Sequence, residues 1–240
     1  MKLLEIAVFS IESAFIAASA GANRIELCEN YENGGTTPSF GYLKTVRKAI
    51  DVPLFVMICP RAGDFVYSES EFNAMKADIQ LCKQIGFDGV VLGILLPDGH
   101  IDIKRTLQLV TLAYPMEVTF HRAFDRCIAP LEALEQIISC GCQRILTSGQ
   151  HLTALEGKNL IKQLIVAADN RIKIVPGGGV RSKNIAELML FTQADEVHSS
   201  AKQTIAAATN FWVEAMHDRK EKIIADTKEI NEMLSILHQL

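Results

Sequence analysis

The stretch "LLEIAVFSIESAFIAASAGANRIELCE" (residues 3–29) predicts one strand–helix–strand unit. Two β-rich runs, residues 3–9 and 23–29, flank a segment with helical periodicity. Ser10 suits the N-cap of that helix, and Gly21 suits its end. Strands that alternate with helices are typical of parallel βαβ units.

The same rhythm continues through the chain. Further β-rich runs occupy residues 52–60, 88–96, 116–122, 143–149, 171–178 and 195–200, which makes eight in all. Helix starts lie between them: a capping-box spacing at Ser68 and Glu71, a first-turn proline at Pro130, and an N-cap residue at Ser182. An open doubly wound sheet also fits this alternation, but the GxGxxG fingerprint is missing after the first strand. The sequence therefore predicts an α/β fold, a single closed (β/α)8 TIM barrel over residues 1–240, without a nucleotide cofactor.

A helical pattern follows the eighth strand over residues 209–240. Its apolar positions include Ile223, Ile224, Ile230 and Met233. We expect the eighth barrel helix with a C-terminal helical extension packed on the barrel. The alternative is an oligomer contact, which would make the protein a homo-oligomer, either a dimer or a tetramer.

The composition argues against several classes of protein. The net charge is −4 and the basic residues are scattered, which disfavours a nucleic-acid surface. No apolar run approaches the roughly 18 residues of a membrane span, and the N-terminus lacks the features of a secretory signal. The six cysteines form no CxxC pair. We expect a cytoplasmic protein with reduced thiols.

Side-chain alternation along the strands predicts which polar groups point into the barrel. The inward set comprises Glu5, Glu26, Cys28, Glu117, Thr119, His121, Lys173, Glu196, His198 and Ser200. Buried charges are costly unless they are paired, so Lys173 is expected to pair with Glu5, Glu117 or Glu196 near the barrel floor. Residues closer to the carboxyl ends of the strands lie where barrel active sites form.

Two loops at this end predict an anion site and acid–base chemistry. In "IVPGGGVRS" (174–182), Gly177, Gly178 and Gly179 precede a helix start and allow close approach of a phosphate, although a tight turn would also need glycine. In "TFHRAFD" (119–125), His121 suits general acid–base work, whereas Arg122 and Asp125 form either a functional pair or a simple ion pair at the rim. The hypothesis assigns catalysis to Glu26, His121, Arg122 and Asp125. It assigns anion binding to Arg61, Gly177, Gly178, Gly179, Ser148, His198 and Ser200.

A third motif raises the question of a metal. In "VMICPRAGDF" (56–65), Met57, Cys59 and Arg61 share one face of the third strand, beside Cys28 on the second. Neighbouring strands lie about 4.8 Å apart, so Cys28 and Cys59 could together hold Cu(I), which prefers sulfur ligands. The alternative is that both cysteines are small buried hydrophobes.

Several of these motifs together resemble one family. "IELCENYENGGTTPS", "VMICPRAGDF", "VTFHRAFD", "RILTSG", "PGGGV" and "HSSA" occur in the order typical of the CutC family of copper homeostasis proteins. The resemblance covers the first to the eighth strand. It implies a (β/α)8 barrel, often oligomeric, with a polar pocket at the C-terminal face and Cu(I) binding that involves the "IELC" thiol, here Cys28. This chain has Cys59 and Ala62 where the family usually reads "MIRPRGGDF", so Cys59 has no counterpart in the family pattern.

Two hypotheses for the function follow. The first is a cytoplasmic copper homeostasis protein that binds Cu(I) through Cys28, with Cys59 as a further ligand. The second is an enzyme that acts on a small phosphorylated or carboxylated metabolite at the C-terminal face of the barrel.

Overall fold

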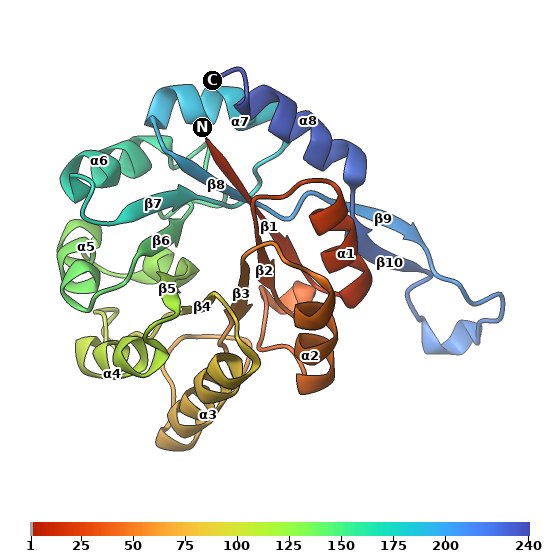
Figure 1. Ribbon diagram of the computed structural model, residues 1–240, viewed down its shortest axis with the longest axis horizontal. Coiled ribbons are helices and arrows are strands. Elements are labelled where there is room, and N and C mark those ends of the chain that lie inside the picture. Colours follow the sequence, from red (N-terminus) through yellow and green to blue (C-terminus); the bar gives the residue numbers. More distant parts are fainter. Residues whose placement is uncertain (1) are drawn as a thin grey trace.

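Eight parallel strands form the inner ring of the computed structural model, which describes residues 2–240 (Figure 1). The ring comprises β1 (Leu3–Val8), β2 (Arg24–Leu27), β3 (Leu54–Met57), β4 (Gly89–Leu92), β5 (Glu117–Phe120), β6 (Arg144–Thr147), β7 (Lys173–Pro176) and β8 (Glu196–Ser199). The ladder runs in the order β7-β6-β5-β4-β3-β2-β1-β8, and its two end strands contact each other. The predicted (β/α)8 barrel is confirmed.

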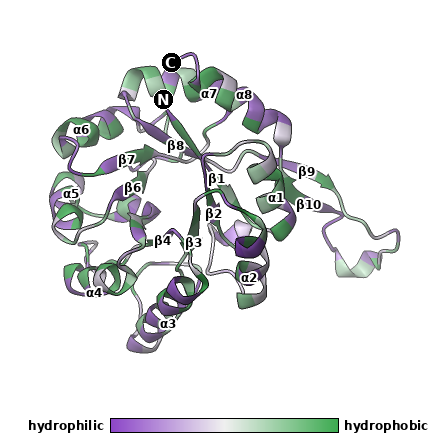
Figure 2. Cartoon of the chain, in the orientation of Figure 1, coloured by the Kyte–Doolittle hydropathy of each residue, from purple (hydrophilic) through white to green (hydrophobic). Residues whose placement is uncertain are grey.

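Helices surround this ring. They are α1 (Ile11–Ser19), α2 (Phe40–Ala49), α3 (Glu69–Ile85), α4 (Ile103–Ala113), α5 (Pro130–Ser139), α6 (Lys158–Ala168), α7 (Ser182–Thr192) and α8 (Thr227–Leu237), with short 3₁₀ turns η1 (Tyr31–Asn33), η2 (Arg122–Arg126) and η3 (Glu214–Met216). Figure 2 shows a largely hydrophilic α3 and a mostly hydrophobic α1. The higher hydrophobicity of α1 follows from its packing, because α1 contacts not only β1 and β2 but also α2, α8 and the strand β10 (Glu221–Ala225).

The helix starts follow the capping pattern of the sequence. The Ser10 side chain accepts the amide of Ser13, Ser68 and Glu71 form a reciprocal capping box, and Pro130 opens α5. One expectation was wrong: Ser182 is the first residue of α7 and not its N-cap. Its amide and hydroxyl are bonded instead to the Glu229 carboxylate of α8, at 2.8 and 3.0 Å.

The strand register arranges the inward side chains in layers. In an eight-stranded barrel of shear 8, residues at the same height along the barrel axis are displaced by one residue from one strand to the next. Each layer of inward side chains therefore comes from alternate strands. Following the register, the lowest layer holds Arg24, Gly89, Arg144 and Glu196, and the next holds Glu5, Phe55, Thr119 and Val175. Above them lie Glu26, Val91, Leu146 and His198, and then Ala7, Met57, His121 and Gly177. The barrel is thus charged at its floor and polar again toward its C-terminal face.

The charged floor has different members from those expected. Arg24 bonds to Glu5 and, at 2.5 Å, to Glu196, which also accepts from Arg144 at 3.0 Å. Both guanidinium groups lie 5.1 Å from the centre of the Phe55 ring. Burial of these charges is compensated because every carboxylate has a cationic partner.

Lys173 does not take part, so its predicted inward ion pair was wrong. Lys173 starts β7 at the N-terminal rim of the barrel, and its ammonium group reaches out to Asp195 at 2.8 Å. A long, flexible side chain at a strand end can keep its charge in water, which is cheaper than burial.

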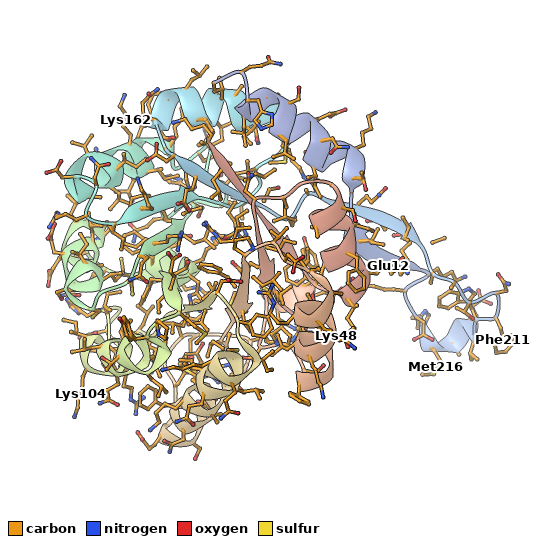
Figure 3. The ribbon with its side chains drawn as sticks, viewed as in Figure 1. Glu12, Lys48, Lys104, Lys162, Phe211 and Met216 are labelled. Atoms are coloured by element: carbon orange, nitrogen blue, oxygen red, sulfur yellow. The ribbon has the colours of Figure 1, made fainter. Side chains whose placement is uncertain are left out.

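The chain after β8 differs from the expected helix. β9 (Lys202–Ala206) and β10 pair antiparallel and form the base of an arm that projects from the barrel (Figure 1). The helical prediction for residues 209–240 was wrong up to residue 226, since Asp226 is the N-cap of α8 and accepts the amides of Lys228 and Glu229. The exposed Phe211 and Met216 lie near the far end of the arm (Figure 3). The expected homo-oligomer stays a prediction.

Across residues 2–240, the structure contains no helix with the length and apolarity needed to span a membrane.

Candidate functional site

A pocket of about 440 Å³ opens at the C-terminal face of the barrel. Its floor is made by Glu26 and His198, one side wall includes His121, and its mouth is formed by the loops after β3, β5, β7 and β8 together with η1. The volume lies in the range of small-molecule sites. The polar residues that alternation turned inward therefore line one common space.

Glu5 lies beneath this floor and pairs with His198. His198 Nδ1 donates to Glu5 Oε1 at 2.6 Å and lies 3.7 Å from Glu26 Oε2. Burial acts to raise the pKa of Glu5, but Arg24 and His198 outweigh it and hold that pKa at about 2. Burial acts to lower the pKa of His198, but the bond to Glu5 and the charge of Glu26 raise it overall. Both pKa shifts favour the charged form of the group.

Glu26 is in a different state. It is buried, and its Oε1 accepts the Cys28 thiol at 3.1 Å. Its Oε2 has no hydrogen-bond partner among residues 2–240 and lies 3.7 Å from His198 Nδ1. Burial raises the pKa of Glu26, and the neighbouring Glu5 adds to the effect, although His198 opposes it. A carboxyl group with a raised pKa beside a pocket is a typical acid–base group.

Cys28 and Cys59 belong to one small apolar cluster with Phe55, Met57 and Val91. The loop after η1 packs against the Cys28 thiol at Gly35, whose φ is 102°. The contact is close, because a Cβ on Gly35 would lie 3.3 Å from Cys28 Sγ and 3.6 Å from Met57 Cε. Burial raises the pKa of both thiols. The structure places the two predicted sulfur ligands in one cluster, which also contains Met57.

Each thiol already has a hydrogen-bond acceptor. Cys28 donates to Glu26, and Cys59 donates to the carbonyl oxygen of Arg61 at 3.1 Å, with Tyr67 Oη 3.4 Å away. Cys59 lines the pocket, whereas Cys28 lies just behind the lining. The sulfur set is soft and fits Cu(I) better than harder ions.

A second group of possible metal ligands involves Glu5, Glu26 and His198, whose donor atoms lie within 4.8 Å of one another. Oxygen and nitrogen donors suit harder ions such as Zn²⁺. However, the Glu5–His198 bond and Arg24 already compensate two of the three groups. Glu5 and His198 therefore need no metal for charge compensation.

His121 follows β5 directly, as the N-cap of η2, and is almost fully buried. Its Nδ1 accepts the amide of Ala123 at 3.2 Å, and its Nε2 has no partner among residues 2–240. Gly93 makes room for the ring, because a Cβ there would lie 2.6 Å from Nδ1. Burial lowers the pKa of His121 to about 4, so the imidazole is neutral near pH 7.

Arg122, Asp125 and Ser148 form a network beside His121. Arg122 donates to Asp125 at 2.8 Å and to Ser148 Oγ at 2.7 Å. Asp125 also accepts the Ser148 amide and hydroxyl, at 3.0 and 2.9 Å. Asp125 thus ties η2 to the end of β6 and orients Arg122, which lines the pocket. Ser148 is fully buried behind the lining.

Cationic side chains line the mouth of the pocket: Arg61, Arg122, Arg126, Arg181 and Lys202. Arg61 is held by Glu71 at 2.6 Å, Arg126 by the carbonyl oxygen of Gly63 at 2.7 Å, and Lys202 by the Tyr31 hydroxyl. Arg126 and Arg181 were not singled out from the sequence, because they follow their strands in loops whose course alternation does not predict. The mouth attracts anions.

The glycine loop reaches this mouth with Gly178 and Gly179, at φ 108° and 69°, while Gly177 lies behind the lining. Gly177 donates its amide to Thr147. A Cβ on Gly178 would lie 3.2 Å from the Ser148 Cβ. The first turn of α7 is partly occupied by Glu229. Five members of the predicted anion site line the pocket, namely Arg61, Gly178, Gly179, His198 and Ser200, whereas Gly177 and Ser148 do not.

The fold and the pocket define a (β/α)8-barrel protein with a small-molecule-sized site at its C-terminal face. The CutC family model matches residues 2–203, and the chain belongs to the CutC family. The chain is 49% identical over 209 residues to the copper homeostasis protein cutC homolog of Mus musculus, which covers 87% of this chain and 77% of that one. It is 47% identical over 210 residues to a CutC family protein of Chromobacterium violaceum, over 88% and 85% of the two chains.

A solved structure agrees with this assignment. The crystal structure of a CutC copper homeostasis protein from Streptococcus agalactiae superposes with a TM-score of 0.80 at 33% identity, over 83% of this chain and 99% of that one. The arm and α8 lie largely beyond residues 2–203, the part that the family model matches.

Proposed function

We propose that this protein acts in copper homeostasis by binding Cu(I) through Cys28, with Cys59 as a second ligand. The observation that supports this function best is the apolar cluster of Cys28, Met57 and Cys59 at the edge of the pocket. Thiolate and thioether sulfur are the ligands that Cu(I) prefers. Cys59 lines the pocket, so an ion in the pocket would meet this thiol first.

Binding requires the loss of thiol protons. The pKa of each thiol is raised by burial, so both are protonated near pH 7. Glu26 accepts the hydrogen bond of the Cys28 thiol and is placed to take its proton. Affinity for Cu(I) therefore increases with pH, because the metal competes with protons for sulfur.

We place this function in the cytoplasm. All six cysteines are free thiols in the structure, and the reducing cytoplasm keeps thiols available for a metal.

A Cu(I) titration tests this function. Under anaerobic conditions, in competition with a chromophoric Cu(I) chelator, we expect binding of about one ion per chain and its loss in Cys28→Ser. Cys59→Ser is expected to weaken binding by at least about tenfold, since it removes one of two thiolates.

Cys140→Ala is the matched control, because Cys140 is also buried but ends α5 at the opposite face of the barrel. Unchanged stoichiometry and affinity in Cys28→Ser would contradict copper binding at this site.

We propose, as a second function for the pocket, that of an enzyme acting on a small phosphorylated or carboxylated metabolite. Its support is the set of five cationic side chains around the mouth. Two buried atoms of lining residues, Glu26 Oε2 and His121 Nε2, have no hydrogen-bond partner among residues 2–240. Arg122 is held by Asp125 with its guanidinium at the pocket, which suits the clamping of an anion.

Thermal unfolding with added anions tests the second function. A ligand at one hundred times its dissociation constant adds about 2.7 kcal/mol to the free energy of unfolding. We expect a saturable rise in melting temperature with inorganic phosphate, and a larger one with sugar phosphates of three to six carbons. Arg122→Gln is expected to weaken this binding at least about tenfold, since it removes a charge-assisted bond.

The control for Arg122→Gln is Arg171→Gln, which removes an exposed pair with Glu135 far from the pocket. The absence of any stabilisation by phosphate or by the sugar phosphates would rule out the second function.

A further inference from the structure

The lining of the pocket carries more cationic than acidic side chains. Five lysine and arginine side chains line it, whereas within residues 2–240 its acidic members are Glu26 and Asp125. A concave site with surplus positive charge attracts anions, because its walls of low dielectric focus the field. The inference below rests on the second proposed function and names the class of its ligand.

Two of the five cations are already compensated by carboxylates. Arg122 pairs with Asp125 at 2.8 Å. Arg61 pairs with Glu71 and Asp64, at 2.6 and 3.0 Å. The remaining three form no ion pair with a carboxylate of residues 2–240: Arg126, Arg181 and Lys202. Their charges are therefore available to a ligand.

Lys202 and Arg181 lie together on one side of the mouth. Lys202 begins β9, its Nζ contacts the Tyr31 hydroxyl, and it lies 4.0 Å from the centre of the Tyr31 ring. Arg181 donates to the carbonyl oxygen of Lys202 at 2.9 Å. Because Tyr31 belongs to η1, which follows β2, the ammonium group lies between the ends of β8 and β2. Neutral partners hold both cations in place and leave their charges uncompensated.

The Gly178–Gly179 turn supplies backbone donors beside Arg181. The amides of Gly178 and Gly179 donate to no acceptor within residues 2–240, and both residues line the pocket with left-handed φ angles of 108° and 69°. Consecutive amides in such a turn form a concavity that binds anions. The loops after strands seven and eight of a (β/α)8 barrel frequently bind phosphate. We call the turn, Arg181, Ser200 and Lys202 the phosphate site.

Arg126 lies across the mouth from the phosphate site. It ends η2, which follows β5, and donates to the carbonyl oxygen of Gly63 in the loop after β3 at 2.7 Å. Its guanidinium lies 4.9 Å from the centre of the Phe65 ring. Arg126 is thus held over the arc of β3, β4 and β5, whereas Lys202 lies over the arc of β8, β1 and β2. The two arcs share no strand, so the two cationic groups face the pocket from different sides.

We propose that the pocket binds a small metabolite with two anionic groups, one at each end. A phosphate binds at the phosphate site, and a second phosphate or a carboxylate accepts N–H groups of Arg126. The planar guanidinium matches both kinds of anion with two parallel hydrogen bonds. The pocket volume of about 440 Å³ suits a ligand of the size of a sugar bisphosphate.

Two pairs of probes test the second anionic group. Fructose 1,6-bisphosphate differs from fructose 6-phosphate by one phosphate, and 3-phosphoglycerate has a carboxylate where glycerol 3-phosphate has a hydroxymethyl group. Dissociation constants are measured by isothermal titration calorimetry at equal ionic strength, because salt screens exposed charges. In at least one pair we expect the doubly anionic member to bind at least about tenfold more tightly, the gain from one hydrogen bond between charged groups.

Arg126→Gln separates the two ends of the ligand. It is expected to remove the advantage of the doubly anionic member and to leave the affinity for the singly anionic member within about twofold, since the two sites are apart. Lys202→Gln and Arg181→Gln are each expected to weaken both members about tenfold, because they remove a charge at the shared phosphate site. All three side chains are exposed or partly exposed, so these changes leave the core intact.

Arg171→Gln is the control, since it removes an exposed charge paired with Glu135, and we expect it to leave all four dissociation constants unchanged. Equal affinities within both pairs would overturn the doubly anionic ligand and leave the second function in place. An advantage that survives in Arg126→Gln would overturn the role of Arg126. Failure of all four probes and of inorganic phosphate to bind would contradict the second function and this inference with it.

Discussion

Replacement of Arg24 by methionine is expected to lower the free energy of unfolding by about 3–5 kcal/mol, because it leaves buried carboxylates without their main counter-charge. Arg24 is 3% exposed and bridges Glu5 and Glu196. After the change, Glu196 keeps Arg144 at 3.0 Å, and Glu5 keeps only His198. Urea unfolding at pH 7 measures the effect, which corresponds to a melting temperature lower by on the order of 10 °C.

The control is Arg171→Met, which removes the exposed pair with Glu135. Such surface pairs contribute about 0–1 kcal/mol. If Arg24→Met were no more destabilising than this control, the charged floor would not be a stabilising part of the barrel.

The second large effect is a loss of folding stability in acid, which we expect from the buried His121. Because the folded protein keeps the pKa of His121 at about 4, against 6.5 in the unfolded chain, the unfolded chain binds a proton between these values and the folded one does not. Stability from this group is complete above pH 6.5 and is lost as the pH falls toward 4. The loss amounts to about 3 kcal/mol.

Urea unfolding between pH 7 and pH 4.5 checks this expectation against His121→Phe, which should lack this part of the pH dependence. The lower limit avoids the titration of Glu5, whose pKa is near 2 in the folded state and which destabilises the fold only below its usual value of 4.5. His238→Asn on the exposed end of α8 serves as the control. Parallel curves for the original protein and His121→Phe would show that His121 is not held neutral.

Much of the barrel could be predicted from local pattern. Eight β-rich runs with capped helices between them leave few alternatives, and the period of two sends Glu26, His121 and His198 to the same interior. These three residues meet at one pocket, as alternation implied. The CutC resemblance was confirmed by the family model and by relatives with nearly half of their residues identical.

The rest depended on long-range contacts. Arg24 was missing from the predicted inward set, although it has the same parity as Glu26, and only the pairing of β1, β2 and β8 reveals its partners. Lys173 has the parity of an inward residue, yet its place at the strand start lets it reach water. Ile223 and Ile224 fit a helix or a strand equally well, and their pairing with β9 decides the outcome.

The hydrogen bond between Cys28 and Glu26 has one more consequence. Glu26 accepts the thiol hydrogen bond of the proposed copper ligand and also lines the pocket of the second proposed function, so the two sites share one side chain. An ion on Cys28 would remove the thiol proton and place a positive charge next to Glu26, in the lining of the pocket. By thermodynamic linkage, a bound sugar phosphate would shift the copper affinity by the same factor by which copper shifts that of the sugar phosphate. Sensitivity of the pocket to copper would then follow from the position of a single carboxylate.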